Sequence, residues 1–160
     1  SSYPQQYGNI LTYLKVKAHK ELKWRKWALD NTAMYQKVTQ GDDVFHVPEF
    51  VTEHTLYFSS DVFKRKPLYL QTGITLKYFT EYYADEFNPL INEFVLQNQT
   101  QIGNYPLLEF FANARVQRAR LFFKLENLNS LWDPGKYLVT PTQPYRDFTI
   151  RFGMVWNFFI

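Results

Sequence analysis

Three histidines are the side chains of this sequence best suited to binding a metal ion. His46 precedes Glu49 by three residues, and Glu53 directly precedes His54, so each pair could offer two ligands. His19 lies far from both pairs in the sequence, whereas a zinc site needs three or four ligands held at one point. The scattered spacing therefore predicts no metal site unless the fold brings these residues together.

The neighbouring serines Ser59 and Ser60 could act as nucleophiles if a histidine served as their base. In an extended chain Ser60 shares a face with His54, as a barrel-shaped lipid hydrolase would need. Neither a third group to orient the histidine nor an oxyanion donor can be identified. The segment Gly41-Asp42-Asp43 indicates a turn, and it lacks the rest of a calcium-binding loop. We therefore predict neither an enzyme nor a cofactor.

Basic and aromatic residues interleave in the segment Lys23-Trp24-Arg25-Lys26-Trp27, a pattern on which single-stranded nucleic acid could stack. The net charge of +3 and the isoelectric point near 9.0 permit such a partner without requiring one. The same segment falls at a turn between two segments of strand-like alternation. We therefore predict no nucleic-acid partner.

The clearest structural element lies at the C-terminus, where apolar residues occupy every second position. Even-numbered positions in 148–160 are all apolar, whereas odd-numbered ones, such as Arg151, are mostly polar or small. This period of two predicts one long strand with an apolar face. Strands that cross an outer membrane need about 9–11 residues, whereas ordinary soluble strands have about 5–6. No apolar stretch approaches the ~18 residues of a transmembrane helix, so any membrane crossing would use strands.

Similar alternation elsewhere predicts an all-β chain, a single segment of an antiparallel up-and-down transmembrane β-barrel spanning residues 1–160. Short turns rich in basic residues alternate with long loops rich in acidic ones. The predicted strands are residues 10–22, 26–39, 50–63, 67–83, 106–116, 118–129 and 146–160, with long outer loops at 40–50, 84–106 and 130–145. The 84–106 loop could extend its flanking strands beyond the membrane or fold inward as a constriction.

Seven strands would leave the two chain ends on opposite sides of a membrane, whereas single-chain bacterial barrels have even strand numbers. The sequence starts at Ser1 without an initiator methionine or a signal peptide, as a mature start or a cut inside a longer protein would. We expect the chain to be the C-terminal strands of a larger barrel, or residues 1–9 to continue from upstream strands.

Several segments resemble the putative-porin family of Bacteroidota outer membranes, as the C-terminal portion of its barrel. They are residues 47–52, 70–75, 78–85 and 145–159, of which 151–159 (RFGMVWNFF) is the most specific. The resemblance covers nearly the whole chain. It implies a Gram-negative outer-membrane barrel folded by the barrel-assembly machinery. Terminal strands recognised by that machinery usually end in an aromatic residue, whereas here Ile160 follows Phe158 and Phe159.

Alternation assigns the charged side chains to the face opposite the apolar one, toward the barrel lumen. They would form a pore lining that biases solute selectivity, a cross-strand charge ladder, or both. Alternating signs favour a ladder of Arg120, Lys124, Glu126 and Arg151. The predicted pore-lining residues are Lys77, Glu109, Arg115, Arg120, Lys124, Glu126 and Arg151, and the predicted lipid-facing residues are Phe148, Ile150, Phe152, Met154, Trp156 and Phe158.

Aromatic residues collect near both ends of the predicted strands, as the two aromatic girdles of a membrane barrel do. The residues near the short turns are Trp24, Trp27, Trp156, Phe158 and Phe159, and those toward the long loops are Tyr35, Tyr57, Tyr78 and Tyr82.

The function that these patterns favour is a porin-like outer-membrane channel for passive diffusion of small polar solutes, embedded in outer-membrane lipid. The alternative is a non-conducting structural subunit of a larger outer-membrane complex, with other outer-membrane proteins as its partners. A soluble lipid-binding barrel is a third interpretation, and it would place apolar side chains inside and polar ones outside.

Overall fold

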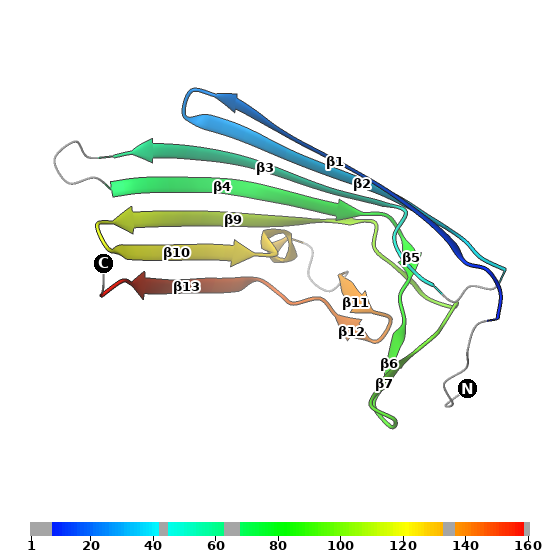
Figure 1. The fold of residues 1–160 in the computed structure, drawn as a ribbon. Coiled ribbons are helices and arrows are strands. Elements are labelled where there is room, and N and C mark those ends of the chain that lie inside the picture. The colour runs from blue at the N-terminus through cyan, green and yellow to red at the C-terminus, as the bar shows by residue number, and fades with distance from the viewer. Residues whose placement is uncertain (1–7, 42–44, 63–67, 133–136, 159–160) are drawn as a thin grey trace.

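Seven long antiparallel strands form one sheet that contains about half of the chain (Figure 1). The computed structural model describes residues 8–41, 45–62, 68–132 and 137–158. Each long strand pairs with the next long strand along the chain, so the sheet is an up-and-down meander, which confirms the predicted all-β antiparallel arrangement. The strands are β1 (Thr12–Trp24), β2 (Trp27–Thr39), β3 (Phe50–Asp61), β4 (Leu68–Phe79), β9 (Tyr105–Val116), β10 (Ala119–Glu126) and β13 (Thr149–Trp156).

The sheet is open. Among the described residues, β1 and β13 each pair with one neighbour and not with each other, so the expected barrel is not closed within this chain. An edge strand presents a row of unpaired backbone N–H and C=O groups. Closure would therefore require β1 and β13 to meet, or further strands to pair with both.

The register of the sheet separates its side chains into two chemically different faces. Residues directly opposite one another in antiparallel strands lie on the same face, and successive residues alternate between faces. The apolar face includes Leu22, Leu29, Leu56, Phe58, Leu70, Ile74, Leu76, Leu108, Phe110, Leu121, Phe123, Ile150, Phe152 and Met154, and the polar face includes Glu21, Asp30, Glu53, Gln71, Thr75, Lys77, Glu109, Asn113, Arg115, Arg120, Lys124, Glu126 and Arg151.

Burial is reversed relative to a soluble protein. Thr75 and Glu109 on the polar face are buried, whereas Phe152 on the apolar face is 78% exposed. No side chain among the described residues is less than 2% exposed, so the sheet lacks a conventional apolar core. Because the covered face is the polar one, the arrangement is opposite to that of a soluble lipid-binding barrel.

The connections at one end of the sheet are tight turns. Arg25 between β1 and β2 has φ 56°, and Gln117 between β9 and β10 has φ 52°, which lets two residues reverse the chain. The connection between β3 and β4 lies largely outside the described residues. We call this end the short-turn end and the opposite end the long-loop end.

Several strands end earlier than the alternation predicted. β4 ends at Phe79, and β13 is confined to Thr149–Trp156. β10 stops at Glu126 because Asn127 adopts a left-handed conformation with φ 54° and the 3-10 helix η1 (Leu128–Leu131) follows. Alternation of side chains continued past these points in the sequence, whereas backbone pairing extends only one residue past β4 and β13, through Thr80 and Asn157.

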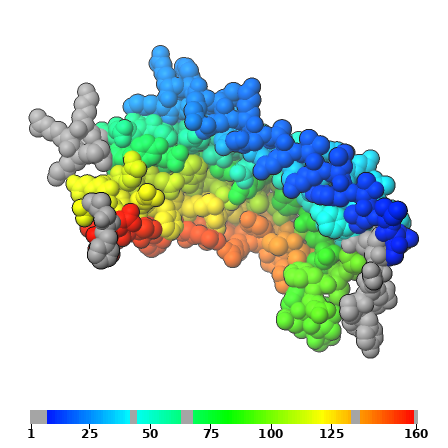
Figure 2. Space-filling model, viewed as in Figure 1, coloured from blue at the N-terminus to red at the C-terminus, as the bar shows by residue number. Residues whose placement is uncertain are grey.

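Short strands at the long-loop end give the loops their own structure. β5 (Tyr82–Tyr83) pairs with β8 (Gln101–Ile102), β6 (Glu86–Asn88) with β7 (Glu93–Val95), and β11 (Leu138–Thr140) with β12 (Gln143–Pro144). The β6–β7 hairpin leaves the end of the sheet at a steep angle (Figure 1) and forms a separate lobe (Figure 2). It therefore does not prolong the line of β4 and β9.

Gly73 on the polar face of β4 marks a close approach between three strands. It lies directly opposite Tyr57 on β3 and Phe111 on β9. A Cβ atom at Gly73 would lie 2.5 Å from the Leu56 carbonyl oxygen and 2.7 Å from the Tyr57 Cβ. We expect Gly73→Ala to lower the free energy of unfolding by about 1–3 kcal/mol, measured by denaturant titration of tryptophan fluorescence.

The matched control for this prediction is Gly153→Ala on β13. A Cβ at Gly153 would meet only ring atoms of Phe122, an exposed side chain that can rotate away. The cost at Gly153 should therefore be smaller, and an equal or larger cost there would contradict the close approach at Gly73.

Candidate functional site

The polar face carries a chain of ion pairs centred on a buried carboxylate. Glu109 on β9 accepts from Lys77 on β4 at 3.1 Å and from Lys124 on β10 at 2.9 Å. Its side chain is 8% exposed, and each lysine is about one-third exposed. The three residues reach one another because β9 lies between β4 and β10 in the sheet.

The chain of charges continues in both directions from this centre. On one side Lys124 contacts Glu126 at 3.0 Å, and Arg151 Nε contacts Glu126 at 3.0 Å. On the other side Lys77 lies 3.8 Å from Glu53 on β3. We call this set of six alternating charges the charge ladder: Glu53, Lys77, Glu109, Lys124, Glu126 and Arg151.

The charge ladder is neutral, because three carboxylates balance three cations. Networked and partly buried ion pairs stabilise more than isolated surface pairs, which contribute about 0–1 kcal/mol. The ladder therefore joins five neighbouring strands, β3 to β13, and leaves each of its charges with a partner.

All seven predicted pore-lining residues lie on the polar face. Five of them belong to the charge ladder, and the other two, Arg115 and Arg120, lie nearer the short-turn end. The sequence-based ladder correctly joined Lys124, Glu126 and Arg151, but Arg120 has no ion pair among the described residues. That these side chains line a pore stays a prediction.

Residues of the predicted lipid-facing set occupy the apolar face of β13. Ile150, Phe152, Met154 and Trp156 alternate along the strand and are exposed. Phe148 precedes the strand and is half-buried, whereas Phe158 follows it and stacks on Trp156 with ring centroids 6.1 Å apart. Their contact with lipid stays a prediction.

Aromatic side chains on the apolar face gather in two bands. Trp24, Trp27, Phe58, Trp156 and Phe158 lie toward the short-turn end, and Tyr35, Phe50 and Tyr78 toward the long-loop end. The placement of Tyr57 in the long-loop band was wrong. Its hydroxyl lies on the polar face nearer the short turns, where it donates to Glu21. Tyr82 belongs to β5 instead of the large sheet, and Phe159 lies outside the described residues.

Comparison with known proteins assigns the chain to a family. The family model described as "Putative porin" matches residues 1–160. The chain belongs to the putative porin family. No curated protein and no solved structure matched it. The resemblance carried by the C-terminal strand and three further segments is thus confirmed at the level of the family, whose members are typically not enzymes.

In this porin-family chain the loops converge over one end of the polar face. Tyr105 and Leu107, on the polar face of β9, form a small core with Tyr137, and the Tyr105 hydroxyl donates to the Leu138 carbonyl at 2.6 Å. The β2–β3 loop joins them through His46, which lies 3.1 Å from Asp85. The β11–β12 hairpin and the loop after β4 therefore cover the long-loop end of the polar face.

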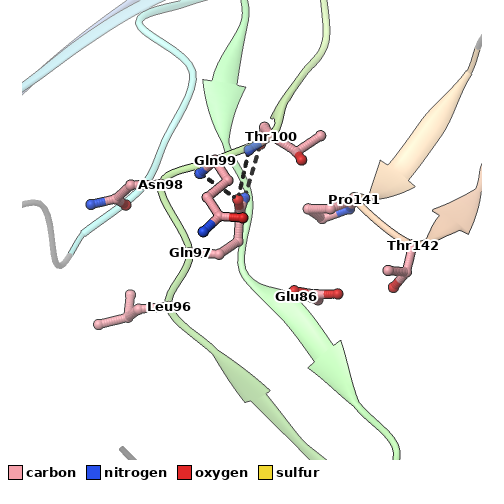
Figure 3. A pocket seen from close by; sticks show the side chains of 8 residues that line it. All are labelled: Glu86, Leu96, Gln97, Asn98, Gln99, Thr100, Pro141 and Thr142. Carbon is pink, nitrogen blue, oxygen red and sulfur yellow. Dashed lines mark hydrogen bonds between the residues drawn. The ribbon is translucent and has the colours of Figure 1, made fainter.

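A polar cavity of about 510 Å³ lies between these loops (Figure 3). Gln97 at its wall is committed to the loop backbone: its Oε1 accepts from the N–H groups of Gln99 and Thr100 at 2.9 and 2.8 Å, and its amide donates to Ala84. In the same loop region, burial of Tyr82 on β5 raises the pKa of its phenol, which therefore stays neutral near pH 7. The polar groups of Gln97 are thus used to hold the loop in shape.

Each of the three histidines of this putative-porin chain has a polar partner: Asp30 for His19, Asp85 for His46 and Asn31 for His54. Across the described ranges, no group of three or more His, Asp and Glu side chains could hold a metal ion. His46 meets Asp85 and not Glu49, and His54 pairs with Asn31 at 2.8 Å. Ser60 accepts from Lys26 at 2.7 Å and is not paired with His54. Within the described part of the chain, no helix is long and apolar enough to cross a bilayer.

Sequence reasoning missed two features of the charge ladder: that Glu53 belongs to it, and that Lys77 pairs with Glu109. Alternation placed Lys77 and Glu109 on one face. Because 25 residues separate β4 from β9, however, the sequence does not show that the two strands are neighbours in the sheet. Glu53 falls in a segment whose alternation was irregular. The signal in the sequence that could have identified Glu53 is its charge, which is opposite to that of Lys77, its partner across the β3–β4 hairpin.

Proposed function

We propose that this chain is part of an outer-membrane β-barrel that acts as a porin-like channel for passive diffusion of small polar solutes. The observation that carries this proposal is the contrast between the two faces of the sheet. One face exposes large apolar side chains on all seven strands, and the other carries the charge ladder. Membership of the putative porin family supports the same localisation.

Strand length and backbone pairing agree with a bilayer environment. The long strands contain 8 to 13 residues, near the ~9–11 that span a membrane. In lipid each unpaired backbone group costs several kcal/mol, so the free edges of β1 and β13 need partners. We therefore propose that these strands belong to a larger barrel, whose additional strands pair with both edges.

A non-conducting structural subunit of a larger outer-membrane complex is the second candidate. Two observations favour it: the loops that cover the long-loop end of the polar face and the neutrality of the charge ladder. Barrels of about eight strands are filled by side chains, whereas ~16–18 strands leave a channel. The two functions differ in conductance, which can be measured directly.

The decisive experiment is conductance of the full-length protein in a planar lipid bilayer. We expect stepwise current increases for the wild type. Arg151→Glu should shift the selectivity toward cations, because Arg151 is about half exposed and the variant changes its charge by two. Arg151→Lys, which keeps the charge, is the matched control.

One outcome would count against the channel, and a second would count against the role of Arg151 in its selectivity. The absence of current steps from protein shown to be folded by its heat-modifiable gel mobility would favour the structural subunit. Current steps with selectivity identical in wild type and Arg151→Glu would show that Arg151 serves the charge ladder and not the permeating ions.

A further inference from the structure

Three arginines at the short-turn end of the polar face lie outside the charge ladder. Arg115 on β9 and Arg120 on β10 are direct partners in the sheet, and Arg118 lies in the turn that joins the two strands. Like charges directly opposite one another destabilise a strand pair. Within the described ranges, no carboxylate forms an ion pair with any of the three. Among the described residues these arginines thus lack the ion-pair partners that the ladder charges have.

The arginines border two adjoining cavities. Arg115, Arg118 and Arg120 line one of about 390 Å³, whose wall contains a single carboxylate, Asp61. Arg115 and Arg120 also line a second cavity of about 460 Å³. Tyr69 belongs to both walls, so the two cavities adjoin. Volumes of this size suit small organic ligands.

The wall of the larger cavity offers both polar and apolar contacts. Gln71 and Asn113 supply amide groups, and Phe122 and Val155 supply apolar surface. The Arg115 guanidinium lies over the Tyr69 ring at 5.4 Å, a cation–π contact that restrains its orientation. Guanidinium groups bind phosphate oxygens in bidentate fashion, so two neighbouring arginines, of which Arg115 is restrained, favour a dianion over a neutral solute.

We propose that Arg115, Arg118 and Arg120 form a binding site for small organic phosphates at the short-turn end of the lumen, which makes the channel selective for these anions. The phosphate group lies against the arginines and the organic part against Phe122 and Val155. This inference rests on the proposed channel function, which it deepens by naming the solute class. It also explains the opposed arginines, whose repulsion a bound dianion relieves.

The test compares two variants with equal loss of charge. Arg115→Gln/Arg120→Gln removes two positive charges from the site, and Lys15→Gln/Lys17→Gln removes two from the polar face of β1, outside both cavities. The readouts are the reversal potential in a KCl gradient and the entry of glucose 6-phosphate and glucose into liposomes containing the full-length protein. Folding of each variant is checked by heat-modifiable mobility.

We expect the arginine variant to lower the ratio of glucose 6-phosphate to glucose entry roughly threefold or more, with the lysine variant close to wild type. Equal effects of the two variants would overturn the site, because general electrostatics would then explain the selectivity. Should the arginine pair be needed for folding, Arg118→Gln in the turn removes one charge from the site without altering a strand, and Lys15→Gln alone is then the control with equal loss of charge.

A second readout separates the site from the channel. If the wild type does not conduct, the channel function fails, and calorimetric titration of the detergent-solubilised protein with glucose 6-phosphate tests the site alone. Binding that weakens about tenfold or more in the arginine variant, but not in the lysine variant, would support the site. No binding of glucose 6-phosphate by the wild type would overturn it.

Discussion

Replacing Met154 with arginine is expected to lower the free energy of unfolding in a phospholipid bilayer by about 2–4 kcal/mol, because a charged side chain would enter the hydrocarbon layer. Met154 is 58% exposed on the apolar face of β13, beside Leu121 of β10. Ile150→Arg on the same face should have an effect of the same sign. The measurement is denaturant unfolding of protein reconstituted in lipid vesicles, followed by tryptophan fluorescence.

Val155 provides the matched control for this prediction. It is adjacent to Met154, is also about half exposed, and lies on the polar face opposite Arg120. Val155→Arg should change stability less than Met154→Arg. If the apolar face met water, an arginine at Met154 would be a surface substitution, with an effect within about 0.5 kcal/mol. Such a small effect at both Met154 and Ile150 would contradict the assignment of the apolar face to lipid.

Glu109→Gln is expected to lower the free energy of unfolding by about 2–3 kcal/mol, since it leaves Lys77 and Lys124 without their shared carboxylate. The cost stays below the 3–5 kcal/mol of a fully buried broken pair because both lysines retain access to water. The change in the free energy of unfolding is measured by denaturant unfolding of the protein in lipid vesicles at two salt concentrations. The loss should persist at high salt, since a buried pair is weakly screened.

Glu53→Gln is the matched control within the same ladder. Glu53 is half exposed and lies 3.8 Å from Lys77, so its loss should cost about 0–1 kcal/mol. In the double variant Glu109→Gln/Lys124→Gln, the second substitution should recover part of the loss. A Glu109→Gln effect no larger than that of Glu53→Gln would show that the ladder contributes little to stability.

These two predictions address the two faces of the sheet independently. Met154 tests what surrounds the sheet, and Glu109 tests what holds neighbouring strands in register on the other side. A large loss of stability at Met154 with a small one at Glu109 would indicate that the sheet lies in a membrane. It would also indicate that the ladder charges contribute little to stability and are available to interact with solutes. A small effect at Met154 with a large one at Glu109 would contradict the contact of the apolar face with lipid, and therefore also the porin-like channel.

The division of side chains between the faces could be read from the sequence. In residues 148–160 every second side chain is apolar, and the structure places Arg151 and Met154 on opposite faces accordingly. Alternation follows from the geometry of an extended backbone, which depends on no distant contact. The same local rule explains why Lys124, Glu126 and Arg151 were correctly grouped: they lie on strands joined by one connection.

The sequence was less informative where the chain leaves a strand or crosses a long loop. The end of β10 depends on the left-handed Asn127, and Tyr57 was misplaced because its position along β3 follows from the pairing with β2 and β4. The β6–β7 hairpin within the 84–106 loop leaves the sheet at a steep angle, so this part of the loop does not prolong β4 and β9 (Figure 1). Such features depend on which distant backbone groups pair, and no local pattern records that.

The sequence by itself therefore determined the β class, the seven strands and the side chains that share a face. Only the tertiary structure decided that β4 pairs with β9 across a 25-residue excursion, which brings Lys77 to Glu109 and opposes Arg115 to Arg120. It also decided that the sheet is open at β1 and β13 within the described residues. The reason is physical: the facing of a side chain is set by its own backbone, whereas an ion pair requires the register of two strands, which long-range hydrogen bonds establish.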